Sequence, residues 1–261
     1  MEVNFINLLQ AFIVYSFLGW CMESIFRSFC EKKLINTGFL YGPFCPIYGL
    51  GAIIMILLLD VFKTNIFVLF LMSVLILTAW EYVVGWLLEK IFKTKYWDYS
   101  DHKFNIKGRV CLTNSIAWGI LGVIFTKYLN EFVFNIINKI PNNINIILLV
   151  IVSIYLIIDI IISVIDMGTL KNNIDRLSEI GKNLKEKLEE LKGTTGNLTI
   201  KQITKEDIEQ KIEELKMQQT KLKDNLIKRT TRLKEAFPTM KSKVITEFLN
   251  QRKIEERRRN K

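Results

Sequence analysis

Five long apolar stretches constrain the fold more than any other feature of this chain. They lie at residues 5–22, 44–62, 66–88, 110–129 and 144–165. A helix needs about 20 mainly apolar residues to cross the ~30 Å hydrocarbon core of a bilayer. Only helices and closed barrels satisfy their backbone polar groups there. The sequence therefore predicts an all-α, polytopic membrane helix bundle with five transmembrane helices. Residues 131–140 are either the end of the fourth helix or a sixth, interfacial helix.

The charged residues mark a boundary near residue 166. Residues 167–261 hold 24 of the 36 lysines and arginines and 15 of the 26 acids, so they carry most of the net charge of +10. Such a composition is typical of helices in water rather than in lipid. We predict two domains: a transmembrane bundle at residues 1–166 and a tail at residues 167–261.

The distribution of lysine and arginine along the chain predicts the orientation of the bundle. They are concentrated in the loops after the first and third stretches and in the tail, and cytoplasmic segments carry this excess. The N-terminus is therefore expected outside and the tail inside. The first stretch has no basic residues before it, so we interpret it as a retained span rather than a signal peptide. The richness in Ile, Asn and Lys is typical of an AT-rich bacterial genome, which favours the bacterial plasma membrane.

The tail has the pattern of paired helices. Apolar residues recur at spacings of three and four within 171–192 and 204–237, which is typical of a coiled coil. A turn-like segment at 193–197 separates the two stretches. The pattern predicts a helical hairpin that pairs with itself or with a second copy of the chain. The basic residues at 252–259 indicate a solvated helix end or contact with anionic lipid. We do not expect nucleic acid binding, because acids interleave the basic residues.

Acidic residues within the apolar stretches are the main functional candidates. A charge inside a membrane is costly, so each such acid is a candidate for function. The prediction is a cytoplasm-facing pocket for a substrate or an ion, lined by Glu23, Glu81, Asp98, Arg27, Arg109 and Asp159. The alternative is structural: Glu81 and Asp159 form interhelical hydrogen bonds, or ion pairs with one of the arginines. For Asp159, nearby Ser163 and Tyr155 are candidate partners.

Two loops at the same predicted side of the membrane are unusual. Residues 34–51 are rich in Gly, Pro and aromatic residues, and prolines disrupt helices. Irregular backbone at membrane depth is tolerated only inside protein or along a wet cavity. We expect a buried or re-entrant loop that leads into an incomplete second span. The loop positions that we assign a structural role are Gly38, Gly42, Pro43, Pro46, Tyr48, Gly49, Trp97 and Tyr99. Trp97 and Tyr99 are either interface anchors or ligand contacts.

The sequence does not predict a metal or a cofactor. The four cysteines form no CxxC pair and His102 is the single histidine, so a zinc site is not expected. We interpret the cysteines as small buried apolar residues. The chain has no GxxxxGK[ST] loop, so it is not itself an ATPase of the P-loop class.

Several of these motifs together resemble a known family. The resemblance rests on Gly38-Phe39, Gly42-Pro43 and Pro46-Ile47-Tyr48-Gly49, followed by Trp97-Asp98-Tyr99-Ser100 and Gly108 with Cys111-Leu112. Gly19-Trp20 with Glu23, and Trp118-Gly119, fit the same pattern. Over residues 5–165 the chain resembles the family labelled putative ABC-transporter type IV, or CmpB-like permeases. The resemblance implies a permease-type subunit of a transport system, with a separate ATPase chain as its partner.

Three functions remain open at this point. The first is the transport subunit just described. The second is a membrane-anchored scaffold or sensor that recruits a cytoplasmic partner through the coiled-coil tail. The third is an intramembrane enzyme for an inner-leaflet lipid, in which Glu81, Asp98 and Glu23 act as acid, base or Mg²⁺ ligands. We favour a protein that is not an enzyme.

Overall fold

A computed structural model describes residues 4–193, 198–242 and 245–246, and the folded elements within these ranges are helices without any strand. The predicted turn at 193–197 and the basic segment at 252–259 fall largely or wholly outside them. The chain divides into two compact units. One contains Met1–Val164 together with Lys234–Ser242, and the other contains Ile165–Leu233 with Lys243–Lys261. The helices are α1 (Phe5–Glu31), α2 (Pro46–Leu58), η1 (Asp60–Phe62), α3 (Ile66–Phe92), α4 (Leu112–Ile124), η2 (Phe125–Leu129), α5 (Asn130–Ile137), α6 (Asn142–Gly193) and α7 (Leu198–Ala236).

Four helices are long and apolar enough to cross a membrane. They are Phe5–Glu31, Ile66–Phe92, Leu112–Ile137 and Asn142–Glu189. The stretch predicted at 44–62 is shorter than expected: α2 has 13 residues, which span about 20 Å. Pro46 occupies its first turn and lacks the backbone N–H that a longer helix would need there. At its other end, the 3₁₀ turn of η1 replaces the expected continuation.

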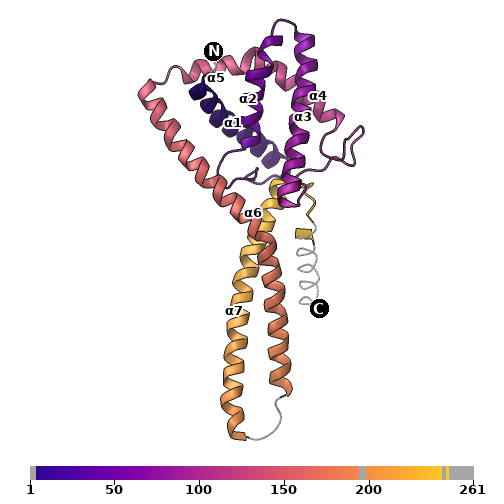
Figure 1. Cartoon of the computed structure of the whole chain (residues 1–261), viewed down its shortest axis with the longest axis vertical. Helices are drawn as coiled ribbons and strands as arrows, with labels where there is room; N and C mark the ends of the chain where they lie inside the picture. Colours follow the sequence, from indigo (N-terminus) through magenta and orange to yellow (C-terminus); the bar gives the residue numbers. More distant parts are fainter. Residues whose placement is uncertain (1–3, 194–197, 243–244, 247–261) are drawn as a thin grey trace. The chain divides into compact units, whose positions relative to one another are not determined.

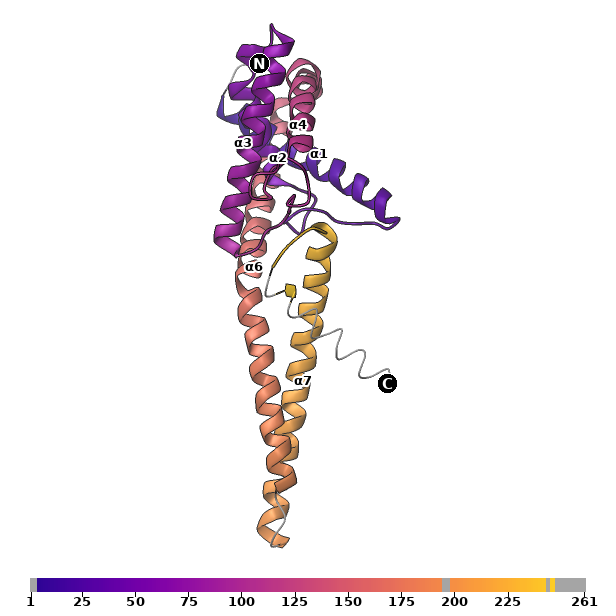
Figure 2. The ribbon, with the colours of Figure 1, turned by 90° about the vertical axis from the view of Figure 1, so that its right-hand side faces the viewer.

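Small residues allow the helices of the first unit to approach closely, as in other membrane bundles. A Cβ atom on Gly49 of α2 would collide with the backbone oxygen of Phe12 in α1. A Cβ atom on Gly122 of α4 would collide with Ser73 of α3. Figure 2 shows α3 and α4 side by side, with the C-terminal end of α1 projecting away from them. The close α3–α4 contact brings their polar positions together.

The third of these long helices, Leu112–Ile137, contains a π-helical turn. η2 joins α4 to α5 without an intervening loop. Of the two alternatives for residues 131–140, the structure therefore has the continuation of the fourth helix, as α5. π-helical turns are common causes of helix bending, and α5 leaves α4 in a new direction (Figures 1 and 2). Asn130 at this turn accepts a hydrogen bond of 3.2 Å from the hydroxyl of Tyr15 in α1.

The loop between α1 and α2 is packed against α1. The hydroxyls of Ser24 and Thr37 are 2.7 Å apart, and the indole N–H of Trp20 donates to the side chain of Asn36 at 2.7 Å. At the end of the loop, the N–H of Cys45 donates to the backbone oxygen of Ser16 at 2.9 Å. The first two bonds join side chains of the loop to α1, and the third satisfies a backbone N–H of the irregular segment. Satisfied backbone is the condition for an irregular loop inside a membrane protein.

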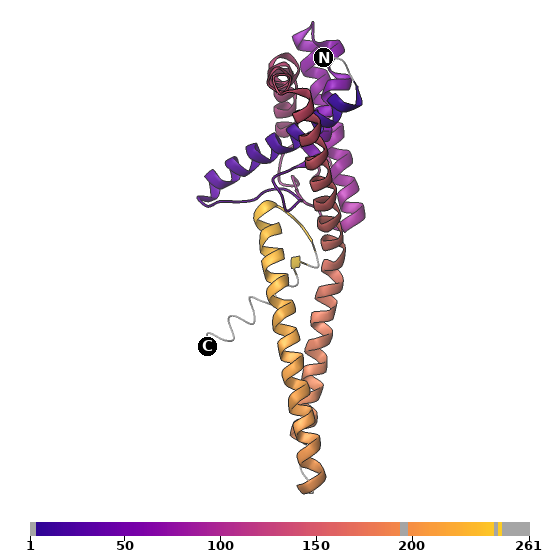
Figure 3. The same cartoon turned by 90° about the vertical axis from the view of Figure 1, so that its left-hand side faces the viewer.

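In the second unit, α7 lies antiparallel to the later part of α6 (Figures 1 and 3). Asp166 of α6 forms an ion pair of 2.5 Å with Arg229 near the end of α7. On α7, Ile208, Ile212 and Leu226 are buried, and all three belong to the predicted apolar seam. Within the described residues, the arrangement is therefore a pair of antiparallel helices (Figures 1 and 3), and a separate tail domain at residues 167–261 stays a prediction. Coiled-coil packing and pairing with a second chain remain predictions.

Candidate functional site

Glu81 is the centre of a buried polar cluster. It lies on α3 with 5% of its surface exposed, and its hydrogen-bond partners are neutral donors. The indole Nε1 of Trp118 donates to Oε2 at 3.0 Å. The hydroxyl of Tyr99 and the amide of Asn114 donate to Oε1 at 3.3 and 3.4 Å. Among the described residues, no lysine or arginine pairs with this carboxylate.

Helix geometry explains how these donors converge. Asn114 and Trp118 are four residues apart on α4, so they lie on the same face, and the close packing of α3 and α4 turns that face toward Glu81. Tyr99 comes from the loop between α3 and α4. The amide of Asn114 also donates to the Tyr99 hydroxyl at 2.5 Å. Burial and the nearby Glu81 raise the pKa of Tyr99 above its ordinary value, so Tyr99 stays a donor at neutral pH.

Glu23 of α1 joins this cluster through Tyr48 of α2. The hydroxyl of Tyr48 hydrogen-bonds to Glu23, and the thiol of Cys45 lies 3.9 Å from Glu23 Oε2. The ring of Tyr48 packs beside that of Trp118, with 6.3 Å between centroids. Tyr48 is also within electrostatic range of Glu81. We call these residues the Glu81 cluster: Glu23, Cys45, Tyr48, Glu81, Tyr99, Asn114 and Trp118.

The two arginines of the predicted pocket pair elsewhere. Arg109 donates to Glu89 Oε2 through Nε and Nη2, at 3.1 and 2.8 Å, and to the hydroxyl of Tyr82 at 3.2 Å. Arg27 forms an ion pair of 3.3 Å with Glu31 one turn later, although it also attracts Glu23 electrostatically. Neither arginine forms the ion pair with Glu81 that the structural alternative included. The interhelical hydrogen bonds that it also included are present, from Trp118 and Asn114 of α4.

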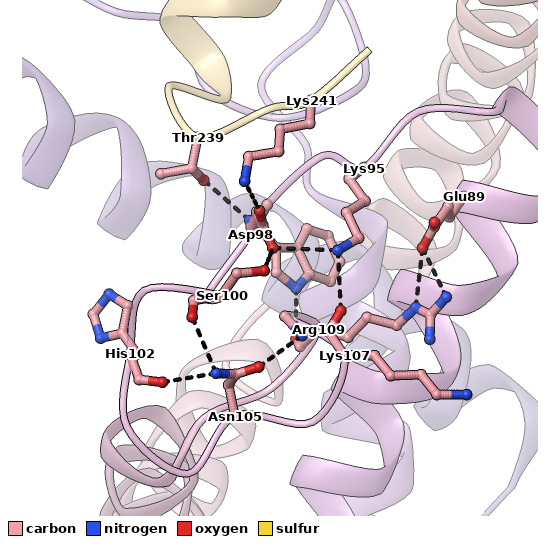
Figure 4. Close-up of polar contacts among 12 residues, drawn as sticks. Glu89, Lys95, Asp98, Ser100, His102, Asn105, Lys107, Arg109, Thr239 and Lys241 are labelled. Carbon is pink, nitrogen blue, oxygen red and sulfur yellow. Dashed lines mark hydrogen bonds and ion pairs between the residues drawn. The ribbon is translucent and has the colours of Figure 1, made fainter. Parts of the chain in front are cut away.

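Asp98 is held in a separate network. Its Oδ1 accepts from Ser100 at 2.6 Å and from Lys95 at 3.3 Å, and its Oδ2 pairs with Lys241. Figure 4 shows Lys241 and Thr239 approaching Asp98 from one side, with Ser100 and Lys95 around the same carboxylate. Asp98 and Glu81 are linked only through the chain, since Tyr99 follows Asp98 directly.

Asp159 of α6 fixes the loop before α2 rather than joining Glu81. Its two oxygens accept from the backbone N–H groups of Tyr41 at 3.0 Å and Gly42 at 2.8 Å. Ser163, one turn later, donates to Oδ1 at 3.3 Å. A Cβ atom on Gly42 would collide with the Tyr155 hydroxyl and crowd Asp159, so this contact requires glycine.

The other loop positions have identifiable local roles. Gly38 has a φ of +92°, a conformation that side chains with a Cβ rarely adopt. Pro46 begins α2 immediately after Cys45. The indole of Trp97 donates to the backbone oxygen of Arg109 at 2.9 Å, and this bond closes the base of the loop between α3 and α4. Pro43 lies in the same buried turn as Gly42, and nothing in the structure assigns it a contact of its own.

The first unit matches a known protein family. The family model described as "Putative ABC-transporter type IV" matches residues 10–164. The chain belongs to this family. The matched span contains the whole Glu81 cluster, Asp98 and Asp159. Neither a search of curated proteins nor one of solved structures finds a match.

A strap outside the family span holds the loop that carries Tyr99. The strap (Lys234–Ser242) belongs to the first unit. Its Lys241 exchanges two backbone hydrogen bonds with Lys95, at 3.0 and 2.9 Å, and the ring of its Phe237 packs edge-on against Tyr96 at 5.0 Å. Asp98 donates its backbone N–H to the hydroxyl of Thr239 at 3.3 Å. Sequence reasoning missed these contacts, although Pro238 signals that the helix stops there.

The strap should stay attached from mildly acidic to alkaline pH. Burial pushes the pKa of Asp98 upward, but hydrogen bonds from Lys241, Ser100 and Lys95 outweigh it and hold that pKa well below its ordinary value. The same contact with Asp98 raises the pKa of Lys241. Because the pKa of Asp98 is lower in the folded protein than in the unfolded chain, its contacts stabilise the attached strap above about pH 4. This stabilisation is lost as the pH falls through the folded pKa. The lysine contribution is lost only above about pH 10.

Hydrogen exchange at the Lys241 amide checks this expectation. Asp98→Asn should speed exchange about tenfold at neutral pH, because hydrogen bonds to a charged group contribute about 1.5–3 kcal/mol and tenfold is about 1.4 kcal/mol. Asp60→Asn is the control, since Asp60 is an exposed acid of η1, outside the loop between α3 and α4. Equal exchange in the two variants would show that the ion pair does not hold the strap.

Proposed function

We propose that this protein is the permease-type subunit of a transport system. In this proposal the Glu81 cluster is a cytoplasm-facing site for a cation, a proton or the cationic group of a transported molecule. The observation that carries the proposal is the buried carboxylate of Glu81, which has three neutral donors and no basic partner among the described residues. Family membership supports a role in transport.

The physical argument concerns the charge of Glu81. An ionised carboxylate in a low-dielectric environment is costly unless a positive charge compensates it. Its three donors supply hydrogen bonds but no net charge. Binding of a proton or a cation would remove the imbalance. Glu23, linked through Tyr48 and Trp118, supplies a second acid within the same cluster, and intramembrane acids of this kind mark ion and proton pathways.

We further propose five membrane crossings, with the N-terminus outside and the tail in the cytoplasm of a bacterial cell. In this topology α2 and its buried loop form an incomplete crossing, which irregular backbone inside protein allows. The distribution of Lys and Arg supports the orientation. The Glu81 cluster would then open toward the cytoplasm, where a separate ATPase subunit would act. One bundle of this size is small for a complete pathway, so a second copy or another chain would complete it.

Tryptophan fluorescence tests ligand binding at Glu81. Because Trp118 donates directly to Glu81, protonation or cation binding should change its emission. The titrants are protons, Na⁺, K⁺, Mg²⁺ and tetramethylammonium, and the Trp118→Phe variant supplies the background of the other four tryptophans. We expect a saturable change that Glu81→Gln removes and Glu131→Gln keeps, since Glu131 lies on α5, outside the Glu81 cluster. An unchanged signal with every titrant would contradict the proposal.

The helical hairpin favours a second candidate function, a scaffold that recruits a cytoplasmic partner. Its supporting observation is the antiparallel pair of α6 and α7, joined by the Asp166–Arg229 ion pair. Replacing residues 170–233 with a short linker, which keeps the strap of the first unit, separates the two functions. Transport that survives the replacement would make the hairpin accessory, whereas loss of partner capture alone would support the scaffold. The enzyme alternative is disfavoured because Asp98 is engaged by lysines and does not converge with Glu81.

A further inference from the structure

The loop between α3 and α4 ends in an exposed apolar tip with basic flanks. We call residues 101–107 the finger. Phe104 and Ile106 are 78% and 56% exposed, and Lys103 and Lys107 beside them are exposed as well. Phe104 is among the most exposed large apolar side chains of the described chain. At its base the finger adjoins both sites, since the ring of His102 packs edge-on against Tyr99 with 5.6 Å between centroids and Asp101 attracts Lys241 of the strap.

The finger is held rigidly. The side-chain amide of Asn105 donates to the backbone oxygens of Ser100 and His102, at 3.2 and 2.8 Å, and its carbonyl accepts from the N–H of Gly108 at 3.0 Å. Ile106 donates its N–H to the backbone oxygen of Val110 at 3.0 Å. A rigid loop presents Phe104 and Ile106 without a further ordering step, which favours binding.

The backbone of the finger is strained in two places. Phe104 has a φ of +53° and Lys107 a φ of +52°. A left-handed conformation is unfavourable for residues with a Cβ and unusual for a bulky one. Such strain tends to persist where it serves a function. Here it occurs at one of the exposed apolar residues and at one of the two flanking lysines.

The position of the finger indicates its partner. It lies between the end of α3 at Phe92 and the start of α4 at Leu112, and both helices are long enough to span a bilayer with their continuations. Figure 4 shows the loop turning at His102 and Asn105 on the side of Asp98 opposite Thr239 and Lys241. The finger therefore points away from the strap.

We propose that the finger docks on an anionic lipid surface, that of the membrane that the helices span. Phe104 and Ile106 enter the boundary between headgroups and acyl chains, while Lys103 and Lys107 contact lipid phosphates. Aromatic and apolar side chains with flanking lysines are suited to this interface, and juxtamembrane lysines are attracted to anionic lipids. Asp101 and His102 are the other ionisable groups of the finger, and the two lysines outweigh the single acid.

Quenching by brominated lipids tests this proposal on the full-length protein in vesicles. The variant Phe104→Trp places a fluorophore at the tip, and the parent protein supplies the background of the natural tryptophans. Asp101→Trp is the matched control, at the base of the same finger. We expect phospholipids brominated near the headgroup end of their chains to quench the tip fluorophore at least about twofold more than the control fluorophore, since the tip would lie in the interface. Ile106→Trp repeats the measurement if Phe104→Trp does not fold.

The lysines are tested by lipid selectivity. Brominated phosphatidylglycerol should quench the tip fluorophore of Phe104→Trp more strongly than brominated phosphatidylcholine. Changing both Lys103 and Lys107 to glutamine should remove this preference. Each lysine is expected to contribute about fivefold to the affinity for anionic lipid. Quenching of the tip fluorophore by aqueous iodide but not by brominated lipid would overturn the proposal and leave a water-exposed tip, available to a protein partner. Equal quenching by both lipids would overturn the anionic part.

Discussion

Replacing Glu81 with glutamine should lower flux through the reconstituted protein by about tenfold or more. Glutamine keeps the shape of the side chain but removes the charge that a cation or proton would neutralise. Hydrogen bonds and contacts to a charged group contribute about 1.5–3 kcal/mol, and about 1.4 kcal/mol changes an equilibrium tenfold. The amide of glutamine would also direct one donor against the donors of Trp118 or Asn114, so one carboxylate contact is lost outright.

The measurement is flux in proteoliposomes that contain the full chain with any partner that co-purifies. The probes are protons and the same cations that titrate the Trp118 signal. Glu81→Asp should keep part of the flux because the charge remains, and Glu131→Gln should keep all of it. Circular dichroism and size-exclusion chromatography separate loss of flux from loss of folding. A folded Glu81→Gln protein with normal flux for every probe would make Glu81 an architectural residue.

The sequence predicted the helical class and most of the long helices because these features are local. The length of an apolar stretch and the spacing of its polar residues are read directly along the chain. Glu81 lies beside Trp118 because polar positions spaced three or four residues apart share one face of each helix, and these faces of α3 and α4 pack against each other. The predicted length of α2 was too great because apolar residues such as Val61 lie in the 3₁₀ turn of η1. Their hydropathy alone does not distinguish them from residues of an α-helix.

The pairing of charged groups was the least predictable part of the candidate site. Asp98 was expected beside Glu81, but its partner Lys241 lies in the strap, far along the chain. Spacing along the chain carries no information on such a contact. Arg109 shows the same limit. The sequence did not distinguish Glu81 from Glu89 and Tyr82 of α3, which are the partners that Arg109 contacts. Asn114 interrupts an apolar stretch of the sequence, but a single polar residue does not reveal which neighbour it faces.

Replacing Asp159 with alanine should destabilise the first unit by about 2–3 kcal/mol. The change leaves the buried N–H of Gly42 without this partner, which costs about 1–3 kcal/mol, and it also removes the acceptor of the part-buried N–H of Tyr41. The carboxylate accepts the backbone N–H groups of Tyr41 and Gly42, and it is buried, with 6% of its surface exposed. The loop before α2 would lose its attachment to α6, so Cys45 and Tyr48 would lose their fixed position near Glu23.

Thermal unfolding in detergent measures this effect, with Ser163→Ala as the matched control. Ser163 contributes one bond of 3.3 Å to Asp159, so its loss should cost about 0.5–1.5 kcal/mol. Asp159→Asn should fall between the two, because its oxygen still accepts from one N–H while its amide opposes the other. If Asp159→Ala unfolds like the parent but loses cation flux, Asp159 handles the ligand rather than the loop. If both stability and flux fall together, the loop is the element through which Asp159 acts, and Glu23 depends on it for its position.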